Sequence, residues 1–181
     1  IMQDITIGSG AIFTVDGDSD IVKIQGSWTN EGTFRNGNST VIFEGSSSQS
    51  LSSGGTSSGK HFYNLELNKD VATSDVNLTN YSVYVENDVL LKKGTLNAGS
   101  RDITVGGDWR NTGAEFNGGS GQISFIGSET DTLVSGGSAF YDLTLSTSTG
   151  SVRVLDNARI ENDFLINSGT FYLDDDTLSI G

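Results

Sequence analysis

The amino-acid sequence predicts an all-β protein that is built as a parallel β-solenoid, also called a β-helix. Three observations predict this fold: apolar runs that recur at a steady spacing, a long internal duplication, and the absence of proline from all 181 residues. The runs are rich in β-branched and aromatic residues, which is typical of strands. We expect about nine coils of roughly twenty residues each.

The apolar runs begin at nearly constant intervals along the chain. Their first residues are Ile5, Ile21, Val41, Leu65, Val83, Ile103, Ile123, Leu143, Ile160 and Leu178. Each interval holds two or three short strands separated by Gly, Asn, Asp or Ser, which tolerate sharp corners. Residues 83–102 therefore divide as "VYVEND", "VLLKKG" and "TLNAGSRD", and residues 103–122 as "ITVGG", "DWRNTG" and "AEFNGGSGQ".

The duplication relates two long repeats. Trp28 matches Trp109, "FYNLEL" at 62–67 matches "FYDLTL" at 140–145, and "VEND" at 85–88 matches "IEND". We interpret the long repeat as four coils. The predicted division is one solenoid segment over 1–181, with a partial leading coil at 1–20, long repeat one at 21–102, long repeat two at 103–177 and the start of the next coil at 178–181.

Proline has no N–H, so its absence fits a ladder in which almost every strand residue bonds the next coil. An antiparallel sandwich also has short strands, but it does not predict a steady register with a longer repeat. The expected core columns contain Phe13, Phe34, Phe43, Phe62, Phe116, Phe125 and Phe140, and we expect Trp28 and Trp109 to pack with them.

The charge balance bears on partners. The net charge is −13, without the basic face that nucleic acid requires, and no run is as long and apolar as a membrane span. The opening "IMQDITIG" has no charged-then-apolar leader, so we expect any signal peptide to be removed or to lie upstream. The absence of cysteine fits both a secreted repeat protein and the cytosol.

The stretches "SWTNEGTFRNGNSTVIFEGSSSQSLSSGG", "FYNLEL" and "VYVENDVLLKKGTLNAGSRDITVGG" resemble the tandem β-solenoid repeats of very large secreted bacterial surface proteins and adhesins. Such proteins are common in Bacteroidetes-like organisms and are often exported by type IX secretion. The resemblance covers residues 21–181. It implies a structural role as a stalk, adhesin or filament body at the cell surface.

Catalytic residues are not expected. His61 is the only histidine, and its counterpart in long repeat two is Ala139. The enzymatic alternative is a carbohydrate-cleaving β-helix, which needs clustered carboxylates or a base beside Arg or Lys. Asp142, Asp156 and Asp163 are individual candidates for that role, without a cluster in the sequence. We therefore predict no enzyme activity and no cofactor, with carbohydrate binding or cleavage as the alternative.

Two acidic stretches invite a calcium interpretation, since carboxylates at a turn suit a hard cation. They are "VDGDSD", which contains Asp16 to Asp20, and "LDDDT", which contains Asp174 to Asp176. Neither matches the EF-hand pattern, and stacked coils place them near opposite ends of a rod, so we expect solvated corners rather than a metal site.

The two ends of the chain have similar sequences. "DITIGSG" at 4–10 and "TLSIG" at 177–181 both match "DITVGG" at 102–107, so the chain is expected to begin and end at the same phase of the coil. An open solenoid end is a template for another strand. The expected partners are therefore copies of the chain end to end, or flanking repeats of one polypeptide, with a surface polysaccharide as a further candidate.

Overall fold

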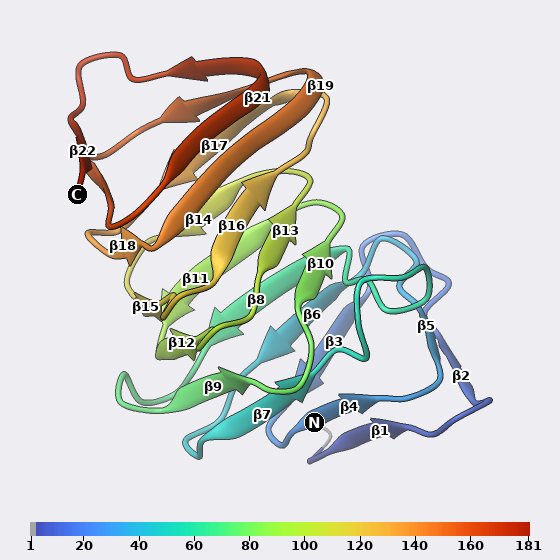
Figure 1. The fold of residues 1–181 in the computed structure, drawn as a ribbon. Coiled ribbons are helices and arrows are strands. Elements are labelled where there is room, and N and C mark those ends of the chain that lie inside the picture. The colour runs from blue at the N-terminus through green and yellow to red at the C-terminus, as the bar shows by residue number, and fades with distance from the viewer. Residues whose placement is uncertain (1–2) are drawn as a thin grey trace.

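Residues 3–181, which the computed structural model describes, form a parallel β-solenoid of about nine coils (Figure 1). The first two residues of the predicted leading coil lie outside this range. No helix occurs among the described residues, and all strand pairs are parallel and join successive coils. The predicted fold class is confirmed.

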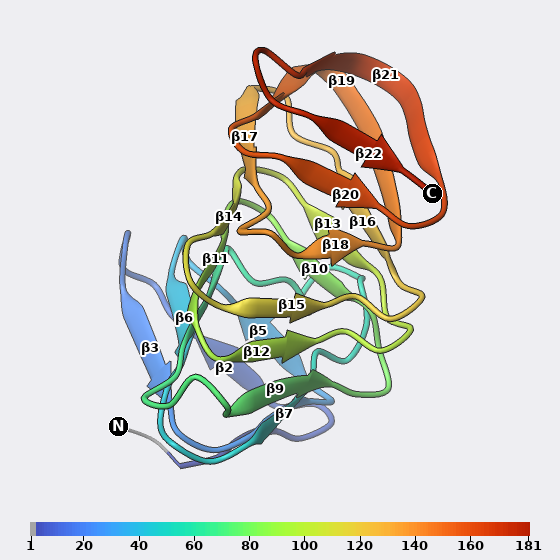
Figure 2. The same cartoon turned by 90° about the vertical axis from the view of Figure 1, so that its left-hand side faces the viewer.

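Three faces surround one core, and a complete coil generally contributes one strand to each face. Face 1 contains β1 (Ile5–Ile7), β4 (Trp28–Asn30), β7 (Gln49–Ser52), β9 (Asp75–Leu78), β12 (Thr95–Asn97), β15 (Glu115–Asn117), β18 (Ala139–Phe140), β20 (Ala158–Ile160) and β22 (Leu178–Ile180). Most of this stack is seen in Figure 2. β15 and β18 lie next to each other and join the two sheets that make up the face.

Face 2 contains β2 (Ile12–Thr14), β5 (Thr33–Arg35), β10 (Val83–Val85), β13 (Ile103–Val105), β16 (Gln122–Phe125) and the first parts of β19 (Asp142–Val154) and β21 (Phe164–Tyr172). In the third coil Phe62, which bridges to Val85, occupies the place of a strand on this face. Face 3 contains β3 (Ile21–Ile24), β6 (Thr40–Phe43), β8 (Asn64–Asn68), β11 (Val89–Lys93), β14 (Trp109–Asn111), β17 (Thr130–Val134) and the last parts of β19 and β21.

The register gives the coil its length. On face 2, Val83 pairs with Ile103, Ile103 with Ile123, and Ile123 with Leu143. The three segments predicted within residues 83–102 contain β10, β11 and β12, one strand each. The three segments predicted within residues 103–122 contain β13, β14 and β15, again one strand each. The predicted divisions are therefore confirmed.

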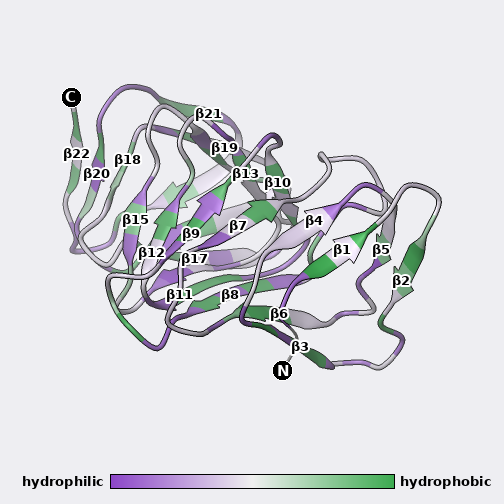
Figure 3. Cartoon of the chain, turned by 90° about the horizontal axis from the view of Figure 1, so that it is seen from below, coloured by the Kyte–Doolittle hydropathy of each residue, from purple (hydrophilic) through white to green (hydrophobic). Residues whose placement is uncertain are grey.

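Residues along many strands alternate between the core and solvent, as in β3, β10 and β13. Figure 3 shows apolar and polar segments following each other along the chain. The inward side chains form continuous columns. Both tryptophans and six of the seven expected phenylalanines are buried, whereas Phe13 is half-buried and packs against the core at the first coil. Backbone N–H groups join successive coils beyond the strands as well, for example Glu31 N to Ile7 O at 2.8 Å.

The structure refines the predicted four-coil length of the long repeat. Trp28 lies on face 1 in β4, but its match Trp109 lies on face 3 in β14. In the same way, Val85 of β10 lies on face 2 and its match Ile160 of β20 lies on face 1. The long repeat is thus one face short of four coils, and each strand of repeat two occupies the face before that of its counterpart.

Corner residues reinforce the ladder with side-chain oxygens. Asp88 Oδ1 accepts from Asp108 N at 2.9 Å, and Asp108 Oδ1 accepts from Thr132 N at 2.7 Å. Each carboxylate thereby satisfies an N–H of the next coil that the strand ladder leaves free. The corners are consequently ordered parts of the solenoid.

Candidate functional surfaces

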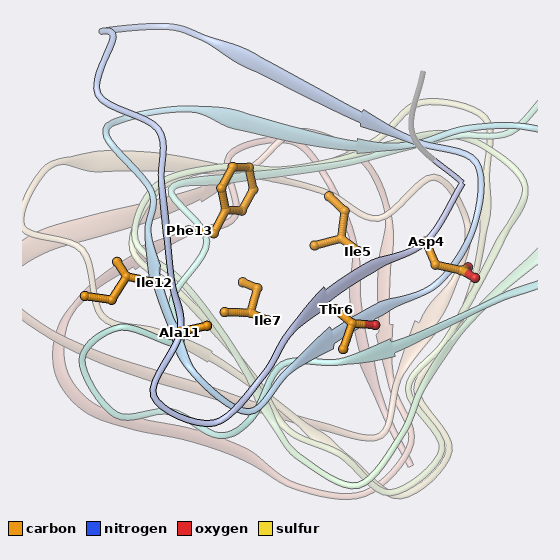
Figure 4. A pocket seen from close by; sticks show the side chains of 7 residues that line it. All are labelled: Asp4, Ile5, Thr6, Ile7, Ala11, Ile12 and Phe13. Carbon is orange, nitrogen blue, oxygen red and sulfur yellow. The ribbon is translucent and has the colours of Figure 1, made fainter.

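The first described coil carries an apolar hollow. Ile5, Ile7 and Phe13 point into the interior of this coil, where they line a cavity of about 350 Å³ (Figure 4). In the coils between the first and the last, the equivalent inward side chains are buried between neighbouring coils. An apolar surface of this kind favours contact with another coil.

The last described coil is uncovered on its opposite side. Ile166 pairs with the buried Leu145, and Ile180 pairs with the buried Ile160, so both isoleucines stand in inward columns. They are nevertheless 47% and 54% exposed, because no further coil covers them among residues 3–181. β1 and β22 both lie on face 1, which confirms that the first and last strands share a phase, although "DITVGG" itself lies on face 2 as β13.

A second kind of surface is a polar cleft in long repeat one. It has a volume of about 540 Å³ and lies where β4 and β7 end and where the chain leaves β9. Its walls carry Thr29, Ser50, Thr79 and Lys60, and Tyr81 stands at its rim. The loop from Gly54 to Phe62 closes one side, and this loop is four residues longer than its counterpart from Gly136 to Phe140.

Two smaller grooves of about 380 Å³ occupy equivalent places in the two repeats. The groove in repeat one is lined by Phe34, His61 and Glu86, and the groove in repeat two by their counterparts Phe116, Ala139 and Glu161. In repeat one, Glu86 accepts from His61 Nδ1 at 3.0 Å and from Asn36 Nδ2 at 3.1 Å.

His61 is fixed by its neighbours. Its ring stacks on Tyr84 with centroids 4.0 Å apart, and its Nε2 lies 3.0 Å from Thr56 O. The ring thus connects the long loop to β10. In repeat two Ala139 takes this place, so the groove there keeps its shape without an imidazole.

Asp131 is the most unusual ionisable group. It points inward from β17, is only 5% exposed, and its Oδ2 has no hydrogen-bond partner among the described residues. Burial, together with the negative charges of Asp108, Asp88 and Glu129, raises its pKa to about 6. The neutral acid is the form that this position favours.

The counterpart of Asp131 in repeat one is Gln49, which is also buried. Gln49 Nε2 donates to Ile24 O at 3.2 Å, and Gln49 Oε1 accepts from Lys69 Nζ. Lys69 is 1% exposed and also donates to Glu44 O at 2.8 Å. Burial lowers the pKa of Lys69, against the opposing charges of Asp70 and Glu44.

Two of the three carboxylates considered individually for catalysis, those of Asp142 and Asp156, accept hydrogen bonds from neighbouring coils. Asp142 Oδ1 accepts from Asn162 Nδ2 and Asp163 N at 2.8 and 2.9 Å. Asp156 accepts from Ser135 N at 2.7 Å and from Gly136 N at 2.7 Å. The structure does not bring Asp142, Asp156 and Asp163 together with a histidine, and these two hydrogen-bond sets are those of corner residues.

The acidic stretches lie at corners near the two ends of the described chain. Asp16 to Asp20 connect β2 to β3, where Asp20 accepts from Gly17 N and Asp18 accepts from Asn38 Nδ2. Asp174 to Asp176 connect β21 to β22, where Asp174 pairs with Arg153. Within residues 3–181 no group of three or more His, Cys, Asp or Glu side chains is placed to hold a metal ion.

Sequence reasoning missed the cleft, Lys69 and Asp131. A lysine or an aspartate beside an apolar run normally signals a solvated strand end, and only the alignment of repeats relates Lys69 to Thr147 and Asp131 to Gln49. The insertion in "SSGGTSSGKH" was the available signal for the cleft.

Comparison of the chain with protein-family models, with curated proteins and with solved structures gave no match. No helix that could cross a membrane occurs in the described part of the chain.

Proposed function

We propose that this chain is a structural repeat of an extracellular bacterial surface fibre or adhesin, whose β-ladder continues end to end. The observation that carries the proposal is that apolar side chains of the core columns lie at both ends of the described coils. At the first end Ile5 and Ile7 line an apolar hollow but are only 7% and 4% exposed, whereas at the second end Ile166 and Ile180 are 47% and 54% exposed.

The physical argument concerns what can cover these surfaces. Another coil covers the open side of a coil completely, because it matches both the shape of that side and its unpaired backbone groups. Either the next repeat of the same polypeptide or a second copy of the chain fits this requirement. The resemblance of the repeats to those of secreted surface proteins supports the extracellular placement.

Charge is compatible with this mode of assembly. The net charge of −13 opposes lateral association between rods, which would bring many carboxylates together. End-to-end contact instead adds backbone hydrogen bonds and apolar burial over a small area. Association along the rod axis is therefore favoured over side-by-side clustering.

The test compares one isoleucine variant with one leucine variant, and the two original side chains are similarly exposed. Ile180→Asp places a charge in an inward column at the end, whereas Leu155→Asp changes a side chain that is 51% exposed at a corner. Electron microscopy and sedimentation at rising concentration should give extended rods for the unmodified chain and for Leu155→Asp, but single segments for Ile180→Asp.

A chain that joins two copies of the sequence provides a second measurement. It should form one rod of twice the length that unfolds in a single transition. Single segments at every concentration, combined with independent unfolding of the two joined copies, would contradict end-to-end continuation. Antibody labelling of intact source cells tests the surface location separately.

A further inference from the structure

We propose that the polar cleft of long repeat one is a binding site for a neutral sugar residue of an oligosaccharide. This inference does not rest on the fibre role, because it concerns the flank of the rod and not its ends. The cleft, at about 540 Å³, has the size of a small-molecule site.

The lining of the cleft matches the hydrogen-bonding groups of a sugar. Thr29 and Ser50 present hydroxyl groups, which both donate and accept, and Asn80 adds an amide. The Thr79 hydroxyl donates to Leu51 O at 3.4 Å and can still accept. A sugar ring likewise carries hydroxyls that donate and accept at adjacent positions. The cleft can therefore both donate hydrogen bonds to one bound sugar ring and accept hydrogen bonds from it.

Charge favours a neutral ligand. Glu31 and Lys60 both line the cleft, so their formal charges offset each other. Lys60 Nζ already donates to Asn30 O at 3.1 Å, to Asn30 Oδ1 at 3.4 Å and to Gly32 O at 2.5 Å. An ammonium group has three N–H donors, so Lys60 has none left for an anionic ligand.

Tyr81 supplies an apolar surface at the rim. Its side chain is 47% exposed, and its ring offers a flat face for the C–H side of a sugar ring. The turn that presents it is tightly held: Asn80 has φ 64°, and Tyr81 N donates to Thr79 O at 2.7 Å. A three-residue turn of this kind is rare and strained, and such strain is concentrated at functional sites.

Long repeat two supplies an internal comparison. Counting back from Ile160 and Val85, Asp156 stands where repeat one has Tyr81. Asp156 bonds Ser135 and Gly136, the counterparts of Ser53 and Gly54, and thereby draws this corner together. The exposed aromatic ring and the long loop occur together in repeat one only.

The experiment measures binding of five neutral oligosaccharides by calorimetry and saturation-transfer NMR: maltohexaose, cellohexaose, laminarihexaose, mannohexaose and xylohexaose. We expect at least one to bind with a Kd between about 0.1 and 10 mM. Tyr81→Ala should weaken this binding at least tenfold, whereas Tyr81→Phe should preserve it within about threefold, because the flat ring is retained.

Two further variants keep the test decisive. Ser50→Leu fills the cleft from a strand position and should also abolish binding, which covers the case in which Tyr81→Ala does not fold. Tyr172→Ala is the matched control, since Tyr172 is 42% exposed on β21, outside the cleft, and its removal should change the Kd less than twofold. Absence of saturable binding to all five sugars, binding of the acidic polymer polygalacturonate alone, or equal losses in Tyr81→Ala and Tyr172→Ala would overturn the proposal.

Discussion

The ring pairs Trp28–Phe34 and Trp109–Phe116 have almost the same geometry, although the two tryptophans lie on different faces of the rod. The Trp28 and Phe34 rings are 4.9 Å apart at 74°, and the Trp109 and Phe116 rings are 4.8 Å apart at 73°. The polar positions differ much more: Gln49 and Lys69 in repeat one correspond to Asp131 and Thr147 in repeat two.

This contrast separates what packing requires from what it tolerates. The aromatic motif needs only an inward position followed by a corner, and all three faces provide one. A buried polar group instead depends on a specific partner in the neighbouring coil, so a change at one position demands a change at another. The repeats therefore agree in their apolar columns and keep buried polar residues such as Asn30 and Asn111, whereas they differ at the buried pair of Gln49 and Lys69.

The largest expected change in the free energy of unfolding tests whether matched core positions in the two repeats contribute equally to stability. Phe43 and Phe125 are matched residues, each 1% exposed, on face 3 and face 2 respectively. Phe43→Asp and Phe125→Asp should each lower the free energy of unfolding by about 4 kcal/mol or more, since each buries an unpaired charge and removes an aromatic ring. Denaturant unfolding measures both, and a small loss in either one would contradict the equivalence.

The next effect distinguishes the buried polar pairs by pH. The pKa of Asp131 is raised to about 6 in the folded chain, above the ordinary value of 3.8. Its neutral form is thus favoured by folding, so its contribution to stability is complete below pH 4 and is lost as the pH rises to 6. The loss is about 3 kcal/mol.

Asp131→Asn should remove this part of the pH dependence and stabilise the chain at pH 7.5, whereas Gln49→Glu should introduce an ionisable group into repeat one. Denaturant midpoints at pH 4.5 and 7.5 provide the measurement. A pH profile that is the same in Asp131→Asn and the unmodified chain would show that other carboxylates, such as Asp88, whose pKa burial also raises, account for it.

A smaller effect concerns the partner of Gln49. Lys69→Met keeps the length of the side chain but leaves Gln49 Oε1 and Glu44 O without their donor, and should cost about 2 kcal/mol. Thr147→Val, the matched change in repeat two, removes one bond to Gly150 O at 2.9 Å and should cost about 1 kcal/mol. If the two variants lowered the melting temperature equally, the expectation that Lys69 contributes more to stability than Thr147 would be contradicted.

The smallest effect is expected at the surface. Asp174→Asn removes the charge that pairs with Arg153, but both side chains are largely exposed and the pair is screened by solvent. Asparagine also tolerates the positive φ of 45° at this position. The free energy of unfolding should change by less than about 0.5 kcal/mol, and a larger loss would assign a structural role to this corner.

Much of the fold could be predicted because a solenoid repeats one local pattern. The apolar runs, corner residues and absent proline each reflect the same ladder, so the strands around Val83 and Ile103 were divided correctly. The face shift could not be predicted, because strands on the three faces have the same alternation and differ only in their partners. The cleft and the Asp131 environment depend on loop paths and neighbouring coils, which the spacing of residues does not contain.

The displacement of each long repeat by one face has a consequence for any longer array. A feature that occurs once per repeat, such as an enlarged loop, would not line up along one side of the rod. In successive copies the feature would move from one face of the rod to the next, and only in the fourth copy would it lie on the same face as in the first. An array built in this way carries the loop on all three faces of the rod, so a binding site in that loop would be exposed in every direction around the axis.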